Sequence, residues 1–343
     1  MAAAVVCACA LAAPAAGWAQ APGKNDAILR YQGADREQRL LERARKEGTV
    51  VVYTSLAPTE STPLAQAFEQ QLGIKVELWR AISEKVVQRT VTEARARRFA
   101  VDVIETNGPE MEMMAREGLF GEFYSPHLAD LPASAVRPHR LWIPDRMNFL
   151  VVAYNTIKVR RDDLPQSYDG FLDPKWNGRI GIEATDAEWM ATLIKQWGEE
   201  RGVAYFRRLA AMRPDVRKGH VLLAELVGAG EIPVGLTIYN GNAESLKRKG
   251  VPIEWVPIEP VVARPQGIAV ASNAPHPHAA LAFVDFVLSP AGQGLFDSMD
   301  RAPASTKVQT RMNRFNYTVI DPATALDEQD KWDRLWHDLF LNR

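Results

Sequence analysis

The chain has almost no cysteine: only Cys7 and Cys9 occur among its 343 residues. Both lie in the opening stretch "MAAAVVCACALAAPAAGWAQAPG", which carries no charged residue and ends in small side chains. This pattern is typical of a secretory signal peptide, and we expect it to span residues 1–19 with cleavage near Ala19. The mature chain then contains no cysteine, which excludes disulfides, thiolate nucleophiles and cysteine-ligated metals.

The chain also has no large excess of positive or negative charge. The 41 basic and 42 acidic residues give a net charge of -1, which argues against a nucleic-acid partner, because such a protein needs a basic face. No internal apolar run approaches the roughly 20 residues that cross a bilayer. Motifs for a nucleophile elbow, a phosphate loop and a zinc-binding helix are also missing, so we expect no enzyme and no cofactor.

What the chain does contain is a regular alternation of strands and helices from about residue 37. The stretch "TVVVYTS" predicts a short buried strand, because it is unbroken and β-branched. "TPLAQAFEQQLG" predicts a helix with Thr62 as cap and Pro63 in its first turn. Such alternation with glycine stops indicates an α/β fold with parallel, doubly wound sheets.

Two long apolar strands, at 146–156 and 265–272, are predicted to cross between two such α/β units. We expect one lobe from 37–148 and 262–305, a second lobe from 149–261, and a C-terminal helical tail over 306–343. Crossing strands of this kind make a hinge, and ligand sites commonly lie between domains joined in this way.

Six segments, in this order, resemble one known family: "EGTVVVYTS", "VDVIETNGPEMEMMAREGLF", "VVAYNT", "DPKWNGRIGI", "GEIPVGLTIYN" and "HPHAALAFVDFVLSPAGQ". The family is that of the periplasmic solute-binding proteins of ABC importers, with the type II two-lobe fold, and the ferric-iron-binding subfamily is the most similar. The resemblance covers residues 40–305. It implies a monomer in the periplasm that closes on one small-molecule solute, leaves it chemically unchanged and delivers it to membrane permease subunits.

The iron ligands that the resemblance implies do not match this chain. Ala57 stands where the iron binders have a histidine, Asn107 stands at their glutamate, and Asn240 with Gly241 replace their paired tyrosines, which leaves Tyr239 alone. Ferric ion is a hard cation that favours several anionic oxygens. We therefore expect no metal site. At the position where the family binds an anion, this chain has Thr185-Asp186-Ala187-Glu188. The fixed carboxylates there would repel an anion.

Ligand contacts are expected where strands end and helices begin, because backbone N–H groups and hydroxyls face the cleft there. The candidates are Thr54, Ser55, Thr106, Asn107, Asp186, Trp189, His220, Tyr239, Asn240 and Arg264. Ordinary turn or helix capping is the alternative for the first four. Arg264 would clamp a ligand carboxylate or pair with a nearby acid.

The segment around Asp186 suggests the sharpest hypothesis. Glu183, Asp186 and Glu188 beside the indole of Trp189 could hold an amine or a metal ion. The alternative is that Thr185 and Glu188 form a capping box, and we expect Glu188 to have this structural role. Packing at the hinge is the alternative to a ligand role for Tyr154. His276 and His278 are expected to be solvated.

The expected function is capture of a small organic solute, one that carries an amine or mixed charge, for an ABC importer. Ferric iron is the first alternative, because the resemblance to the ferric-iron-binding subfamily favours it as the ligand. A periplasmic sensor that docks on a membrane receptor is the second, since it needs the same closing cleft.

Overall fold

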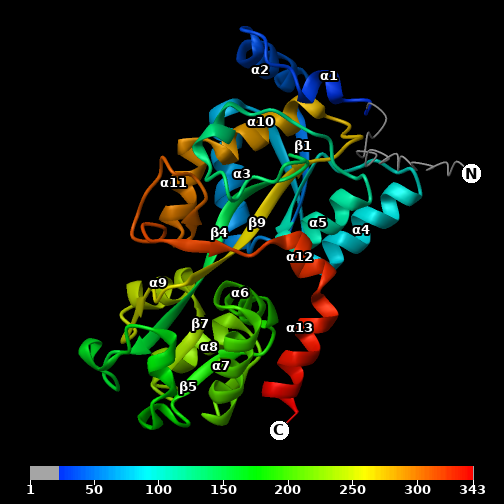
Figure 1. Ribbon diagram of the computed structural model, residues 1–343. Helices are drawn as coiled ribbons and strands as arrows, with labels where there is room; N and C mark the ends of the chain where they lie inside the picture. The colour runs from blue at the N-terminus through cyan, green and yellow to red at the C-terminus, as the bar shows by residue number, and fades with distance from the viewer. Residues whose placement is uncertain (1–22, 343) are drawn as a thin grey trace, which may run out of the picture.

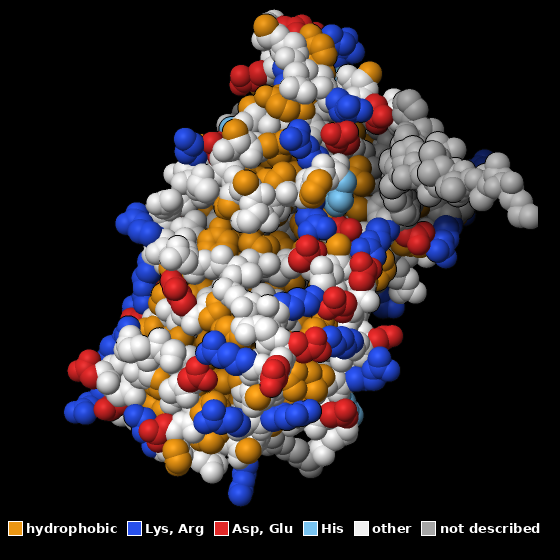
Figure 2. All heavy atoms as spheres, in the orientation of Figure 1, with side chains coloured by type: hydrophobic (Ala, Val, Ile, Leu, Met, Phe, Trp, Pro, Cys, Tyr) orange, Lys and Arg blue, Asp and Glu red, His pale blue; other side chains and the backbone are white. Residues whose placement is uncertain are grey.

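The computed structural model describes residues 23–342, so the predicted signal peptide and both cysteines lie outside the described part. Two α/β lobes lie one above the other, and the strands β4 (Ile143–Asn155) and β9 (Val261–Val270) run between them (Figure 1). This arrangement confirms the predicted fold class. The face drawn in Figure 2 mixes acidic and basic side chains without a large area of one charge.

The first lobe is built around three parallel strands, with β1 between β2 and β3. Its elements are α1 (Asp26–Leu29), α2 (Arg36–Glu47), β1 (Thr49–Thr54), α3 (Pro58–Leu72), β2 (Lys75–Arg80), α4 (Ser83–Arg95), β3 (Val103–Asn107), α5 (Gly108–Arg116), α10 (Pro277–Leu288) and α11 (Pro290–Ser298). The prediction for α3 was wrong at its start: the helix begins at Pro58, and Pro63 lies inside it. Proline suits the first helical position because its φ angle is already helical.

The crossing strands explain how the two lobes share one sheet. β9 pairs with β3 in the first lobe, while β4 pairs with β9 up to Leu150 and with β7 (Val234–Tyr239) and β8 (Ile253–Val256) beyond it. Arg264 on β9 stands opposite Asn148 on β4, in the middle of this crossing. A residue there is fixed by hydrogen bonds of both strands and faces the space between the lobes.

The second lobe repeats the parallel pattern, with β5 between β6 and β7. Its elements are β5 (Ile180–Glu183), α6 (Ala187–Trp197), α7 (Glu199–Ala211), β6 (Asp215–Arg217), α8 (His220–Ala229), β7, α9 (Asn240–Arg248) and β8. Short 3-10 turns occupy η1 (Pro126–Asp130), η2 (Arg161–Asp163), η3 (Tyr168–Leu172) and η4 (Pro174–Trp176). The carboxyl ends of β5 and β7 therefore meet the starts of α6, α8 and α9.

The C-terminal tail touches both lobes. After the short strand β10 (Ala302–Pro303), it comprises β11 (Tyr317–Val319), α12 (Pro322–Asp327), α13 (Gln329–Trp336) and the π-helical η5 (His337–Leu341). α12 packs on α5, α13 packs on α6, and Figure 1 shows the red tail passing from the upper lobe to the lower one. Besides its helices the tail contains β11, which pairs with β9.

No single helix among residues 23–342 is both long and apolar enough to cross a membrane. α10 and α11 reach that length and hydropathy only as a pair, and they are bent by 59°. Most of α10 is buried in the first lobe, where Phe283 packs edge-on against Phe68 with ring centroids 5.1 Å apart.

Gly267 on β9 tests how tightly the crossing strand is packed. A Cβ at this position would lie 2.5 Å from Cε3 of Trp142, whose side chain is fully buried. Gly267→Ala should therefore lower the free energy of unfolding by about 1–3 kcal/mol, measured by chemical denaturation. Gly294→Ala on α11, where a Cβ would meet no atom within 4 Å, is the matched control and should not be destabilising. Equal stability of the two variants would contradict this packing.

Candidate functional site

A cleft of about 1310 Å³ lies between the two lobes and the tail. The first lobe contributes Glu84, Asn107 and Glu110 to its wall, from α4, the end of β3 and α5. The second lobe and the crossing strand contribute a set of polar side chains: Thr185, Glu188, His220, Tyr239 and Arg264. The tail adds an apolar side that includes Leu326, Trp332 and Trp336.

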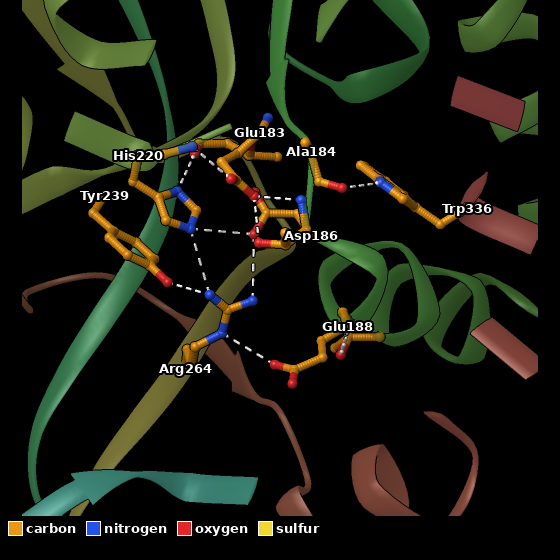
Figure 3. Close-up of polar contacts among 12 residues, drawn as sticks. Glu183, Ala184, Asp186, Glu188, His220, Tyr239, Arg264 and Trp336 are labelled. Atoms are coloured by element: carbon orange, nitrogen blue, oxygen red, sulfur yellow. Dashed lines mark hydrogen bonds and ion pairs between the residues drawn. The ribbon is translucent and has the colours of Figure 1, made fainter. Parts of the chain in front are cut away.

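Arg264 is the centre of the polar contacts in this cleft (Figure 3). Its Nε donates to Glu188 at 3.0 Å, its Nη2 donates to Asp186 at 3.3 Å, and its Nη1 donates to the hydroxyl of Tyr239. The Asp186 side chain is fully buried, and that of Arg264 is 13% exposed. The guanidinium thus supplies the positive charge that a buried carboxylate needs.

His220 completes the network from the first turn of α8. Its Nδ1 lies 3.2 Å from the carbonyl oxygen of Thr237, and because a carbonyl can only accept, Nδ1 carries the proton. Its Nε2 lies 3.4 Å from Asp186 Oδ1 and 3.5 Å from Arg264 Nη1. The imidazole stacks on the ring of Tyr239, with centroids 3.8 Å apart.

Burial governs the protonation of the network. It raises the pKa of Asp186, and its neighbours His220 and Arg264 offset part of this effect. Burial also raises the pKa of Tyr239 well above its ordinary value, against the opposing effect of Arg264. The Tyr239 hydroxyl is therefore a neutral phenol that accepts from the guanidinium, and not a phenolate.

The expected capping box at the start of α6 is wrong. Thr185 donates both its N–H and its hydroxyl to Glu183 Oε2, at 2.5 and 2.6 Å, and Gly219 N–H donates to Glu183 Oε1 at 2.7 Å. These bonds lower the pKa of Glu183 in spite of its burial. Glu188 therefore does not cap α6. Its carboxylate accepts from Arg264, and the side chain lines the cleft.

Glu183, Asp186 and His220 place one possible metal-ligating atom each within 4.8 Å of one another. Both oxygens of Glu183 already accept hydrogen bonds, however, and Arg264 already balances the charge of Asp186. The chemistry of this donor set is thus that of an ion-pair network, in which a metal ion would have to displace a guanidinium.

The structure brings part of the predicted set together. Asn107, His220, Tyr239 and Arg264 line the cleft, and Asp186 lies directly behind Arg264. Asn107 donates to Ser83 at 2.8 Å and makes no side-chain cap of α5.

Five predicted residues do not face the cleft. Thr54 is buried and donates to the carboxylate of Glu105. Thr106 is buried and donates to the hydroxyl of Ser55 at 3.0 Å, so the hydroxyls of these three residues bond inside the first lobe. Asn240 donates to the carbonyl of Met312 at 2.8 Å, away from the cleft. Trp189 is fully buried against Phe206 in the core of the second lobe.

Two histidines and one tyrosine outside the cleft also have definite positions. His276 and His278 each bind a carboxylate through Nδ1, Asp102 at 2.9 Å and Glu47 at 2.7 Å, so the expectation that they are solvated was wrong. Tyr154 is buried in the second-lobe core, as packing at the hinge requires.

Sequence reasoning missed two of the three glutamates of the cleft, Glu84 and Glu110, and assigned a capping role to the third, Glu188. Glu84, Glu110 and Glu188 each stand in the first turn of a helix: α4, α5 and α6. Acidic residues in a first turn are normally explained by the helix dipole, so their positions gave no indication of a ligand site. Burial raises the pKa of Glu110, and the nearby charges of Glu188 and Glu84 raise it further. The carboxylates therefore crowd one another across the cleft, from both lobes.

A double-mutant cycle tests the buried pair of Asp186 and Arg264. Arg264→Met should cost about 3–5 kcal/mol of unfolding free energy, because it leaves Asp186 buried without a cation, and adding Asp186→Asn should restore part of that loss. The matched control is Arg201 with Asp169, an exposed pair of the same lobe at 3.0 Å, whose coupling should stay below about 1 kcal/mol. Equal coupling in both cycles would contradict the assigned network.

Comparison with known proteins places this cleft in a family. A profile of the bacterial extracellular solute-binding proteins matches residues 101–318. Iron uptake protein A1 of Synechocystis sp. is 24% identical over 284 residues, which are 78% of each chain. The Fe(3+)-binding periplasmic protein of Serratia marcescens is 26% identical over 192 residues, which are 54% of this chain and only 56% of that protein.

Solved structures show the same fold. Iron-bound HitA from Pseudomonas aeruginosa superimposes with a TM-score of 0.72 at 24% identity, over 85% of this chain and 99% of that one. The periplasmic binding protein AfuA from Actinobacillus pleuropneumoniae, with fructose-6-phosphate bound, gives 0.69 at 22% identity, over 87% and 100%. The two-lobe fold, the cleft and the matched residues 101–318 lead to one conclusion: this chain belongs to the bacterial extracellular solute-binding proteins.

Proposed function

We propose that this protein is the substrate-binding subunit of an ABC importer, and that it captures a small organic solute with a cationic group in the cleft between its lobes. It would act in the periplasm after cleavage near Ala19 and pass the solute to the membrane permease subunits. The proposal assigns no chemical change to the solute.

One observation supports the ligand class: two carboxylates of the first lobe face the cleft, while its arginine is already paired with carboxylates of the second lobe. Glu84 and Glu110 come from the first lobe and Glu188 from the second. Arg264 is held by Asp186, Glu188 and Tyr239. A cation between the lobes would relieve the repulsion around Glu110 and so favour closure, since a ligand shifts a conformational equilibrium by its preference for one state.

The size and lining of the cleft favour an organic solute over a bare ion. About 1310 Å³ exceeds the range that drug-sized ligands usually occupy, so a closing motion has room to act. Trp332, Trp336 and Leu326 offer an apolar side to the hydrocarbon part of a solute.

Ferric iron is the second candidate, because the names of the relatives from Synechocystis and Serratia point to it. The site offers it a single phenol, Tyr239, which burial keeps neutral. A hard trivalent cation needs several anionic oxygens, and Arg264 in contact with that phenol would repel it.

A thermal-shift panel sorted by ligand charge tests the proposal. It should contain organic amines, zwitterions, organic anions and ferric citrate. We expect an amine-bearing compound to raise the melting temperature by several degrees, in proportion to the logarithm of its concentration. Glu110→Gln should weaken this response, whereas Glu77→Gln, an exposed residue of β2 paired with Lys75, should leave it intact. A response confined to anions, or a coloured protein with ferric citrate, would contradict the ligand class.

The ligand-free protein offers a second test through pH. Because the pKa of Glu110 is raised by folding, its protonated form favours the folded state, and wild-type stability should fall as pH rises above the ordinary value of 4.5. Glu110→Gln removes this loss, so the variant should gain stability relative to wild type from about pH 4.5 upward, measured by thermal melts. A difference that stays constant with pH would show that Glu110 feels no repulsion in the cleft.

A further inference from the structure

The C-terminal tail is attached to both lobes, and α12 holds it to the first lobe through two ion pairs. Arg116 of α5 donates through both Nη1 and Nη2 to the carboxylate of Asp327, with Nη2 at 3.1 Å from Oδ2. Arg137 Nη1 lies 3.1 Å from Asp321 Oδ1. The Asp327 and Asp321 side chains are 58% and 53% exposed. Water therefore screens both pairs, and pairs of this kind hold two elements together only weakly.

The other end of the tail is part of the second lobe. Trp332 and Trp336 of α13 and Phe340 of η5 belong to the hydrophobic core of that lobe, and they are 4%, 2% and 3% exposed. Trp336 Nε1 also donates to the carbonyl oxygen of Ala184 at 2.7 Å, just after β5 (Figure 3). The burial of three large aromatic side chains stabilises a contact several times more than two exposed ion pairs do. The tail is thus attached firmly to the second lobe and weakly to the first.

The attachment changes from one lobe to the other between two neighbouring residues. Asp327, the last residue of α12, is bound by Arg116 of the first lobe. Glu328 follows directly and caps the start of α13: it pairs with Lys195 of α6 at 2.7 Å and accepts from Trp332 Nε1 at 2.7 Å. A rotation of one lobe against the other about β4 and β9 must therefore either bend the chain at this link or separate α12 from α5.

We propose that the tail is a strap with a releasable latch, and that the latch is formed by the two ion pairs of α12 with the first lobe. When the lobes move, α13 and η5 stay in the second lobe and the latch opens, because it is the weaker of the two attachments. The strength of the latch then sets part of the free energy that a solute must supply to change the separation of the lobes. The inference rests on the proposed movement of the lobes but on no particular solute.

Bending at the link between Asp327 and Glu328 is the competing possibility. In that case α12 stays on α5 throughout the movement, and the strength of its ion pairs has no effect on the separation of the lobes. The two possibilities therefore differ in what happens when the latch is weakened.

Distances between spin labels, measured by pulsed EPR on the mature chain without solute, test the latch. Both cysteines lie in the predicted signal peptide, so labels can be attached at Glu77→Cys in the first lobe and Arg201→Cys in the second. These side chains are 51% and 65% exposed, and neither lines the cleft. In this background Asp327→Asn should broaden the distribution of distances and raise the unlatched fraction about two- to fivefold. About 0.5 M sodium chloride should broaden it as well, and less so in the variant.

Two further variants make the result specific. Arg116→Gln removes the same ion pair from the other side and should reproduce the effect of Asp327→Asn. Lys331→Gln also removes an exposed ion pair of the tail, with Glu199 at 3.0 Å, but at the end that the second lobe holds. It should leave the distribution unchanged, because the aromatic side chains keep that end in place.

An unchanged distribution in both Asp327→Asn and Arg116→Gln would overturn the proposal in favour of bending at the link. Equal broadening by Lys331→Gln would overturn it too, because the weak attachment would then not be confined to the first lobe. These outcomes are measured without a solute, so they are independent of the ligand class proposed above.

Discussion

The burial of Arg264 is the constraint on which the rest of the site depends. β9 is shared by both lobes, and at its midpoint it places a guanidinium in a largely dry environment. The charge is tolerable only because Asp186 and Glu188 of the second lobe lie at 3.3 and 3.0 Å. Glu183 accepts the hydrogen bonds from the N–H and the hydroxyl of Thr185, so Thr185 and Glu188 form no capping box at the start of α6. The Glu188 carboxylate is thereby available to Arg264.

This network decides which charge the cleft offers to a solute. A free arginine at the crossing would make the cleft a receptor for anions, but its donors are already used by the protein. The acids at helix starts that remain outside this network, Glu84 and Glu110, belong to the first lobe and face the cleft. The family's scaffold is therefore kept, while the electrostatics at its centre differ from what the names of the iron-binding relatives would suggest.

The sequence was sufficient to predict the α/β alternation, the crossing strands and the two lobes, because short β-branched runs and glycine stops are local signals. It also placed His220 and Tyr239 at the cleft, by the rule that ligand sites form where strands end and helices begin, and Arg264, which lies inside the crossing strand β9. It failed for Thr54 and Thr106, since the same rule does not say which hydroxyls will bond inside the lobe. The prediction for Trp189 failed for a related reason. Trp189 follows Glu188 directly on α6, so its side chain lies on a different face of the helix, and that face packs in the core.

Glu84 and Glu110 of the cleft, and its tail wall, could not be predicted for a different reason. Helix dipoles explain first-turn acids locally, and only the packing of two lobes shows that three of them converge. The most direct measurement is a crystal structure of the protein with the compound that raises its melting temperature. The cationic group should lie between Glu110 and Glu188, with Arg264 still bound to Asp186. An anionic group on Arg264, with Asp186 displaced, would contradict the central role of this ion pair.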